Sequence, residues 1–107
     1  MSIKTITQEN FKAEVEQSPL PVLVDLWAPW CVFCRRLTPA LERLSEKMAG
    51  QLTVGSINVD DQPELGRLLE ADTIPCLYLY RGGSHGEKLV APASQAQVEE
   101  WISSQLG

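Results

Sequence analysis

The fold of this chain is constrained most by residues 25–39, where an apolar run leads through a short turn into two cysteines and then into a helical pattern. Two residues separate Cys31 from Cys34. If Cys34 lies in the first turn of a helix, Cys31 lies at the start of that helix and the two sulfur atoms can meet. The sequence therefore predicts a reversible disulfide at a helix N-terminus.

The same position favours the thiolate form of Cys31. The first turn of a helix has unpaired N–H groups and carries the positive end of the helix dipole, and both stabilise a negative sulfur. Arg35 and Arg36 add positive charge beside it. Because the thiolate is the form that attacks another disulfide, Cys31 is the candidate nucleophile.

Composition and charge exclude several classes of protein. The chain has 107 residues, of which 44% are hydrophobic, so it can bury the core of a single domain spanning residues 1–107. Its formal net charge of -5 argues against nucleic acid or an anionic membrane as the main partner. No apolar run approaches the roughly 20 residues of a membrane span, and residues 1–10 lack the apolar centre of a signal peptide, so we expect a cytoplasmic protein. Three cysteines do not make the paired framework of a secreted, disulfide-rich domain.

Hydrophobic periodicity and turn residues predict strands and helices that alternate along the chain. Strands are expected at residues 3–7, 22–27, 52–59, 76–80 and 87–90. Helices are expected at residues 8–17, 34–48, 63–69 and 95–106. Thr7 and Ser94 are the expected caps of the first and last helix, and the turn at residues 81–86 (RGGSHG) joins the last two strands into a hairpin.

The order of elements, β-α-β-α-β-α-β-β-α, predicts an α/β fold. Alternation favours parallel strands joined by right-handed crossovers, and the closing hairpin adds antiparallel strands. We therefore expect a mixed central β-sheet of about five strands, flanked on both faces by four helices. Sites in such sheets lie at the carboxyl ends of the strands, and Cys31 follows the end of the strand expected at residues 22–27.

From one end to the other, the chain resembles the thioredoxin family. The motifs that carry the resemblance are VDLWAPWC, the CxxC pair, a proline five residues after the second cysteine, LTVGSINVDDQP, the Ile74–Pro75 step and the RGG turn. The resemblance implies the thioredoxin fold and a thiol–disulfide oxidoreductase that reduces protein disulfides. It further implies substrate proteins that contain disulfides, an electron donor similar to thioredoxin reductase, and no cofactor or metal beyond the redox-active Cys31–Cys34 disulfide.

The resemblance also implies roles for individual residues. Cys31 would attack the substrate disulfide, and Cys34 would resolve the mixed disulfide that results. Asp25 matches a buried acid that helps to move protons to and from the resolving thiol. Pro75 matches a cis-proline whose loop faces the sulfurs and holds the substrate backbone. The full set of expected substrate-binding residues is Trp30, Ile74, Pro75, Cys76, Val90 and Ala91.

Two departures from the family pattern affect the reactive groups. Val32 and Phe33 stand between the cysteines, where thioredoxins have Gly-Pro, so the reduction potential does not follow from the resemblance. Ser56 replaces a lysine beside the buried acid, so Asp25 lacks a cationic partner and desolvation should raise its pKa.

Two further departures affect the substrate surface. Ala91 and Pro92 occupy a loop in which the family has a glycine, which suggests a narrower groove. Cys76 follows Pro75, where threonine is usual, and the resemblance places it within a few ångströms of the active-site sulfurs. Cys76 is interpreted in three ways: as a small buried core residue, as a redox partner that competes with Cys34 or pairs with Cys31, or as a metal ligand.

Alternative functions follow from the same residues. A disulfide oxidase or isomerase would differ in reduction potential, and a binding module would keep the fold and use the cysteines only to anchor a partner. A metal or iron–sulfur carrier would use Cys31, Cys34 and Cys76 with a fourth ligand from elsewhere. His85 is the nominal fourth ligand, but a lone histidine in a glycine-rich turn is more typically solvated.

Overall fold

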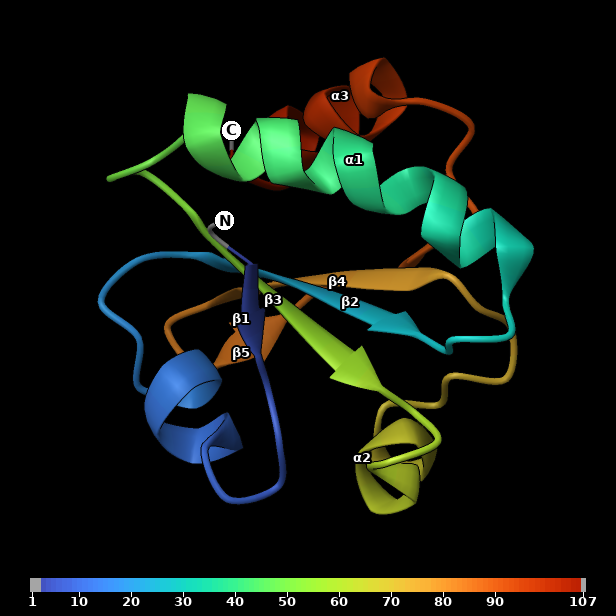
Figure 1. The fold of residues 1–107 in the computed structure, drawn as a ribbon. Coiled ribbons are helices and arrows are strands. Elements are labelled where there is room, and N and C mark those ends of the chain that lie inside the picture. Colours follow the sequence, from blue (N-terminus) through green and yellow to red (C-terminus); the bar gives the residue numbers. More distant parts are fainter. Residues whose placement is uncertain (1–2, 107) are drawn as a thin grey trace.

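A mixed six-stranded sheet forms the centre of the computed structural model, which describes residues 3–106 (Figure 1). Its strands are β1 (Ile3–Thr5), β2 (Val22–Trp27), β3 (Thr53–Asn58), β4 (Cys76–Arg81), β5 (Ser84–His85) and β6 (Leu89–Val90). Their order across the sheet is β1-β3-β2-β4-β5, and β6 also pairs with β4. The strands β1, β2 and β3 are parallel, whereas β4 runs antiparallel to β2. The expected mixed α/β architecture is confirmed.

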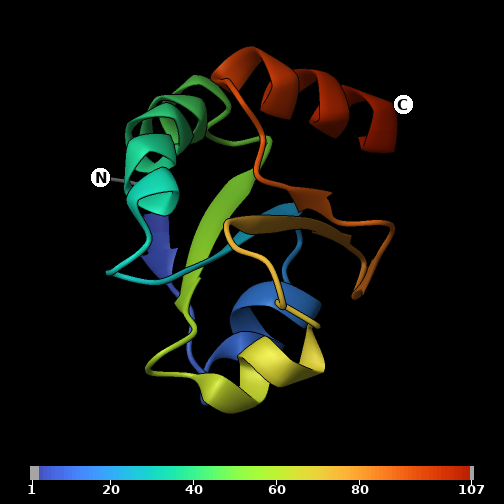
Figure 2. The same ribbon diagram turned by 90° about the vertical axis from the view of Figure 1, so that its right-hand side faces the viewer.

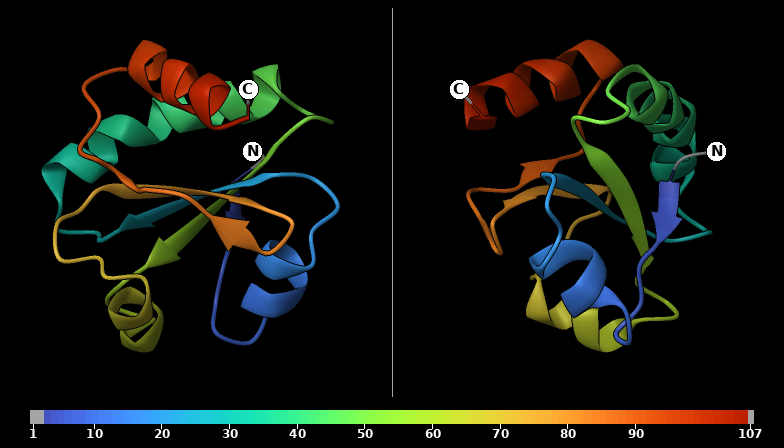
Figure 3. Two further views of the ribbon diagram at one scale, coloured as in Figure 1. Left: turned by 180° about the vertical axis from the view of Figure 1, so that it is seen from behind. Right: turned by 90° about the vertical axis from the view of Figure 1, so that its left-hand side faces the viewer.

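Helices cover both faces of the sheet, as Figures 1 and 2 show. One face lies under α1 (Val32–Lys47) and α3 (Gln95–Leu106), and the other lies against the short helices η1 (Lys12–Glu16) and α2 (Pro63–Leu68). The rear view in Figure 3 shows the same two layers of helices on either side of the strands. None of the helices found between residues 3 and 106 combines the length and apolarity that crossing a membrane requires.

The central strand β2 sends alternate side chains into two separate cores. Leu23 packs with residues of α1 and α3, including Leu41, Leu44 and Ile102. Val22, Val24 and Leu26 pack on the opposite face, in a cluster with Phe11, Val15, Leu65 and Leu69. This division follows from the two-residue period of a strand. An apolar residue at nearly every position is therefore what a strand covered on both faces requires, and Asp25 is the exception.

Local hydrogen bonds define the helix termini, and the first helix begins later than predicted: residues 8–10 form a turn, η1 starts at Lys12, and Thr7 is therefore not its cap. The Thr7 N–H donates to Asn10 Oδ1 at 2.8 Å, which closes the turn before η1. The Gln97 N–H donates to Ser94 Oγ at 3.1 Å at the start of α3, as expected of a cap. Gly50 has a φ of +85° just after α1, a conformation that favours glycine.

The returning edge strand differs from the prediction of one strand at residues 87–90 after a long turn. Gly82 and Gly83 have φ angles of +62° and +88° and make a tight turn by themselves, so β5 pairs with β4 immediately. His85 pairs with Tyr80 of β4, and Leu89 pairs with Leu77. The edge therefore takes four residues to cover the distance that β4 covers in three. One extra residue therefore bulges out, which divides the edge into β5 and β6 and gives six strands in place of five.

Candidate active site

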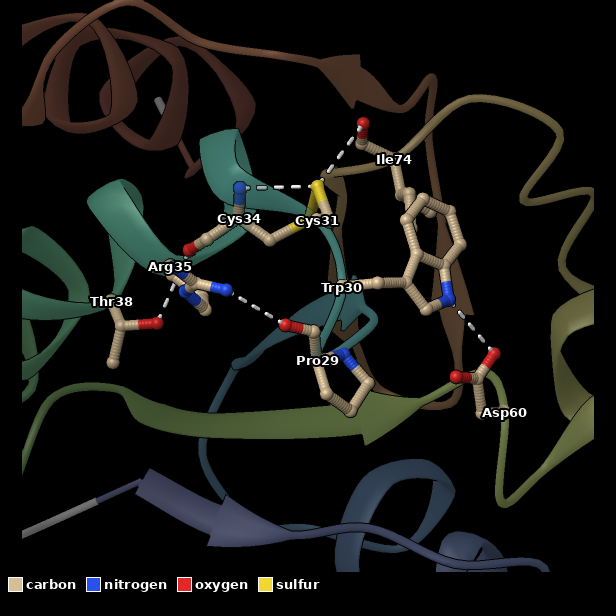
Figure 4. Close-up of a disulfide and its surroundings, with 8 residues drawn as sticks. All are labelled: Pro29, Trp30, Cys31, Cys34, Arg35, Thr38, Asp60 and Ile74. Carbon is tan, nitrogen blue, oxygen red and sulfur yellow. Dashed lines mark hydrogen bonds between the residues drawn. A yellow bond between two sulfur atoms is a disulfide. The ribbon is translucent and has the colours of Figure 1, made fainter.

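Cys31 and Cys34 form a disulfide at the N-terminus of α1 (Figure 4). Cys31 is the N-cap residue with an extended backbone, and its Sγ accepts a hydrogen bond from the Cys34 N–H at 3.2 Å. The Cα atoms of the two residues are 5.2 Å apart. Cys31 keeps 8% of its surface exposed, whereas Cys34 keeps 1%. The predicted position of the pair is confirmed, and Cys31 is the more accessible of the two sulfurs to another molecule.

The turn between β2 and α1 fixes the direction in which Cys31 points. The Cys31 N–H donates to the Ala28 carbonyl at 3.1 Å, and the Arg35 N–H donates to the Cys31 carbonyl at 3.1 Å, which starts the helix. The Arg35 side chain donates back to the Pro29 carbonyl at 3.2 Å. The disulfide therefore lies just beyond the carboxyl end of β2, where the order of elements predicts a site.

A second loop faces the disulfide from the start of β4. The Ile74–Pro75 peptide bond is cis, as the resemblance implied. The Ile74 carbonyl oxygen lies 3.9 Å from Cys31 Sγ (Figure 4). The Pro75 carbonyl accepts a hydrogen bond from the Ala91 N–H at 2.9 Å, which ties a third loop to the same place. Two segments that are distant in sequence thus meet at Cys31 Sγ, and a third is bonded to one of them through Pro75.

Large apolar side chains are exposed near the disulfide. Trp30 is 66% exposed and its indole N–H donates to Asp60 Oδ1 at 3.3 Å (Figure 4). Val32, Phe33 and Val90 are exposed as well. Neighbouring exposed apolar groups are typical of surfaces that bind a partner. Nothing in the sequence predicts the contact with Asp60, because the two residues lie 30 positions apart in the chain.

Asp25 is a carboxyl group buried within the sheet. It is 4% exposed, and its Oδ1 has no hydrogen-bond partner among residues 3–106. Its neighbours in the sheet are Ser56 on β3 and Leu77 on β4, so it shares the face of Leu23 and Leu77, the one that α1 covers. Burial raises the pKa of Asp25 to about 7. The carboxyl group can therefore gain or lose a proton near neutral pH.

Cys76 does not belong to the exposed surface around the disulfide. Its side chain has no exposed surface and packs in the core cluster of Leu26 and Tyr78, on the face opposite Leu77. Burial is the main cause that raises the pKa of the Cys76 thiol, which disfavours its reactive thiolate form. The expectation that this side chain contacts substrate is therefore not supported, and the interpretation as a buried core residue fits the structure best.

The three-cysteine metal site is not assembled in this conformation. Within residues 3–106, no three His, Cys, Asp or Glu side chains are close enough together to hold a metal ion. His85, the nominal fourth ligand, lies in β5 and not in a turn. Its ring packs against Tyr78 and Tyr80, with centroid distances of 4.5 and 4.9 Å.

Comparison with known proteins identifies the family. The family model described as Thioredoxin matches residues 2–104. The chain belongs to the thioredoxin family. A thioredoxin of Rickettsia bellii is 35% identical over 101 residues, which cover 94% of this chain and 96% of the relative. A thioredoxin of Alicyclobacillus acidocaldarius is 37% identical over 102 residues, covering 95% and 96%.

A third relative contains a thioredoxin as part of a longer protein. It is a bifunctional thioredoxin reductase/thioredoxin of Mycobacterium leprae, 37% identical over 93 residues that cover 87% of this chain and 20% of the relative. Together with the Cys31–Cys34 disulfide, these comparisons establish the thioredoxin fold and a protein-disulfide oxidoreductase activity. The thioredoxin expectation is confirmed for family, fold and class of reaction.

Ala91 holds a backbone conformation that favours glycine, the residue that thioredoxins have in this loop. Its φ is +46°, in the left-handed region where a Cβ atom is disfavoured. We expect Ala91→Gly to raise the free energy of unfolding by about 0.5–1 kcal/mol, since the released strain exceeds the added flexibility of the unfolded chain. Urea denaturation measures the change. Ala93→Gly is the control and should lower stability, and an equal loss in Ala91→Gly would contradict the prediction.

Proposed function

We propose that this protein reduces the disulfides of other proteins by dithiol–disulfide exchange, with Cys31 as the nucleophile and Cys34 as the resolving thiol. The observation that carries the proposal is the difference between the two sulfurs. Cys31 keeps 8% of its surface exposed, lies beside Ile74 and accepts a hydrogen bond from the Cys34 N–H, whereas Cys34 keeps only 1%. A substrate disulfide can thus approach Cys31, whereas Cys34 is shielded from the substrate and reacts only after the mixed disulfide has formed.

The first step is the attack of the Cys31 thiolate on one sulfur of the substrate disulfide. A bond forms between Cys31 Sγ and that sulfur, the substrate S–S bond breaks, and the second substrate sulfur leaves as a thiolate. The Cys34 N–H and the positive end of the α1 dipole stabilise the attacking thiolate, because both place positive charge beside the sulfur.

The second step releases the substrate. Cys34 loses its proton and attacks Cys31 Sγ, which restores the Cys31–Cys34 disulfide and frees the first substrate sulfur as a thiolate. We propose that the Asp25 carboxylate accepts the Cys34 proton, since its pKa of about 7 allows exchange near neutral pH. Overall, two electrons and the two thiol protons pass from the protein dithiol to the substrate.

The loops around Cys31 would position the substrate. Trp30, Val90 and Ala91 would contact its side chains, and the backbone at Ile74 and Pro75 would lie along the substrate chain next to the sulfurs. Exposed apolar contacts of this kind exclude water from the reacting atoms. The Pro75 carbonyl is already bonded to Ala91, which leaves the Ile74 carbonyl as the acceptor that faces the reaction centre.

The electron donor would be a protein similar to thioredoxin reductase. The name of the Mycobacterium leprae relative joins a thioredoxin reductase and a thioredoxin, which supports this pairing for a protein that regains its dithiol by disulfide exchange. A cytoplasmic location fits the proposed direction, because the cytosol keeps thiols reduced.

Insulin reduction with dithiothreitol tests the reaction, and the reduction potential tests its direction. We expect the protein to accelerate insulin precipitation and to have a potential near or below that of the cytosolic glutathione pool, since only then does it act as a reductant. A potential well above that pool would instead indicate an oxidase or isomerase. A lack of insulin reduction would contradict the proposal.

Cys34→Ser should trap the mixed disulfide. The variant retains Cys31 but lacks the thiol that resolves the complex, so substrate proteins should remain bound through an intermolecular disulfide. Non-reducing electrophoresis of the variant after incubation with oxidised insulin measures the adduct. The matched control, Cys31→Ser with Cys34→Ser, should form none. An equal amount of adduct from both would show that Cys31 is not the attacking residue.

A further inference from the structure

We propose that a groove beside the disulfide binds an acidic, partly apolar segment of the substrate protein. This groove lies between residues 33–43 of α1 and the segment that leads into α3. Figure 2 shows that segment as the loop that rises from the sheet toward α3. Its volume is about 340 Å³, and its main lining residues are Phe33, Arg36, Arg43, Pro92, Ser94 and Gln95. The inference rests on the proposed function, since it concerns which protein disulfides are reduced.

The α1 side of the groove is one continuous stripe of side chains. Residues 33, 36, 40 and 43 are three or four positions apart, so they share one face of the helix. Phe33 lies between the two cysteines and is 47% exposed, which places the start of the groove directly beside the disulfide. A segment that flanks a substrate disulfide would therefore enter it when that disulfide meets Cys31.

The groove is basic although the protein is acidic. Two arginines line it and no acidic residue does, while the whole chain has a net charge of -5. Arg36 is exposed and makes no hydrogen bond or ion pair with any other of the described residues. Arg43 donates from Nε to Gln95 Oε1 at 2.9 Å, which fixes its guanidinium at the groove wall. One unpaired and one preoriented guanidinium are thus available to a ligand.

These groups select the occupant by charge and polarity. A guanidinium binds a carboxylate through two parallel hydrogen bonds, more specifically than an ammonium group does. The exposed ring of Phe33 offers apolar contact next to the arginines. The groove therefore suits a substrate segment with Glu or Asp beside a large apolar residue. Arg35 does not take part, because it is bonded to the Pro29 carbonyl.

The test compares two peptides that each contain one internal disulfide and differ only in the residues after the second cysteine, Glu-Leu-Glu or Gln-Leu-Gln. The rate constant for reduction by the dithiol form of the whole protein is measured at low ionic strength. We expect the acidic peptide to react about three- to tenfold faster, and we expect Arg36→Gln to reduce this ratio about threefold. Combining Arg36→Gln with Arg43→Gln should bring the ratio close to one.

Lys12→Gln is the matched control. Lys12 is an exposed cation on η1, on the opposite face of the sheet, so its loss lowers the net charge equally but leaves the groove intact. It should leave the ratio unchanged. The rate with the uncharged bis(2-hydroxyethyl) disulfide is measured for every variant, and each peptide rate is divided by it, so that any effect of the lost charge on the Cys31 thiolate cancels.

Each outcome supports or overturns the inference. Equal effects of Lys12→Gln and Arg36→Gln would show only long-range attraction and would overturn it. Equal reduction of both peptides would overturn it as well, and if insulin is still reduced, the proposed function stands. If dimerisation of the protein, measured by sedimentation, is lost in Arg36→Gln while the peptide ratio is unchanged, the groove is occupied by a second copy and not by substrate. Failure to reduce insulin and both peptides would overturn both proposals.

Discussion

Cys31→Ser is expected to lower the rate of insulin reduction by roughly a thousandfold or more, because no other group can form the covalent intermediate. A serine hydroxyl is far less acidic than a thiol, so the Cys34 N–H and the α1 dipole that stabilise a thiolate cannot generate an alkoxide at neutral pH. Cys34 cannot take over, since it is 1% exposed. The measurement is the initial rate of insulin precipitation with dithiothreitol as the electron source.

Cys76→Ala is the matched control for the loss of a thiol. Cys76 is fully buried on the other face of the sheet from Leu77, and its thiolate is disfavoured, so this variant should keep its activity. A large loss in Cys76→Ala, with near-normal activity in Cys31→Ser, would reverse the roles that we assign to the two cysteines. Circular dichroism of both variants shows whether the fold is preserved.

Most of the fold could be predicted because its determinants are local. The apolar run at residues 22–27, interrupted only by Asp25, identifies a strand covered on both faces, and β2 has those bounds. The division of the edge into β5 and β6 could not be predicted, since the bulge between His85 and Leu89 depends on how that segment pairs with β4. The double glycine at Gly82 and Gly83 was the available signal for a tighter turn.

The site was only partly predictable, because some of its contacts join residues that are distant in sequence. The spacing of Cys31 and Cys34 determines their geometry once a helix begins there. In contrast, the approach of Ile74 to Cys31 joins residues 43 positions apart, and only the resemblance to a family indicated it. Proximity in sequence to Pro75 also suggested that Cys76 faces the sulfurs, but the alternation of side chains along β4 turns it to the opposite core.

Asp25→Asn is expected to stabilise the oxidised protein by roughly 2–4 kcal/mol at pH 8 and by much less near pH 4. Burial raises the pKa of this carboxyl group from 3.8 to about 7. Between these two values the folded state binds a proton that the unfolded state does not. The contribution of Asp25 to the free energy of unfolding is therefore fully present below about pH 4 and is lost as the pH rises through 7. Above that pH the buried carboxyl group, whose Oδ1 is unpaired, carries a charge, which is unfavourable in the core.

Urea denaturation of Asp25→Asn and of the original protein from pH 4 to pH 8 measures this difference in stability. The contributions of the other carboxyl groups cancel in the difference because both proteins contain them. Asp61→Asn, which changes an exposed carboxylate in the turn after β3, should alter stability little at any pH. A difference in stability between Asp25→Asn and the original protein that does not grow with pH would contradict the raised pKa.

Because an asparagine cannot accept a proton, the same variant should release substrate from the mixed disulfide more slowly, about tenfold or more. Greater stability combined with slower release would mean that the buried acid is retained for proton transfer, at the expense of the stability of the fold.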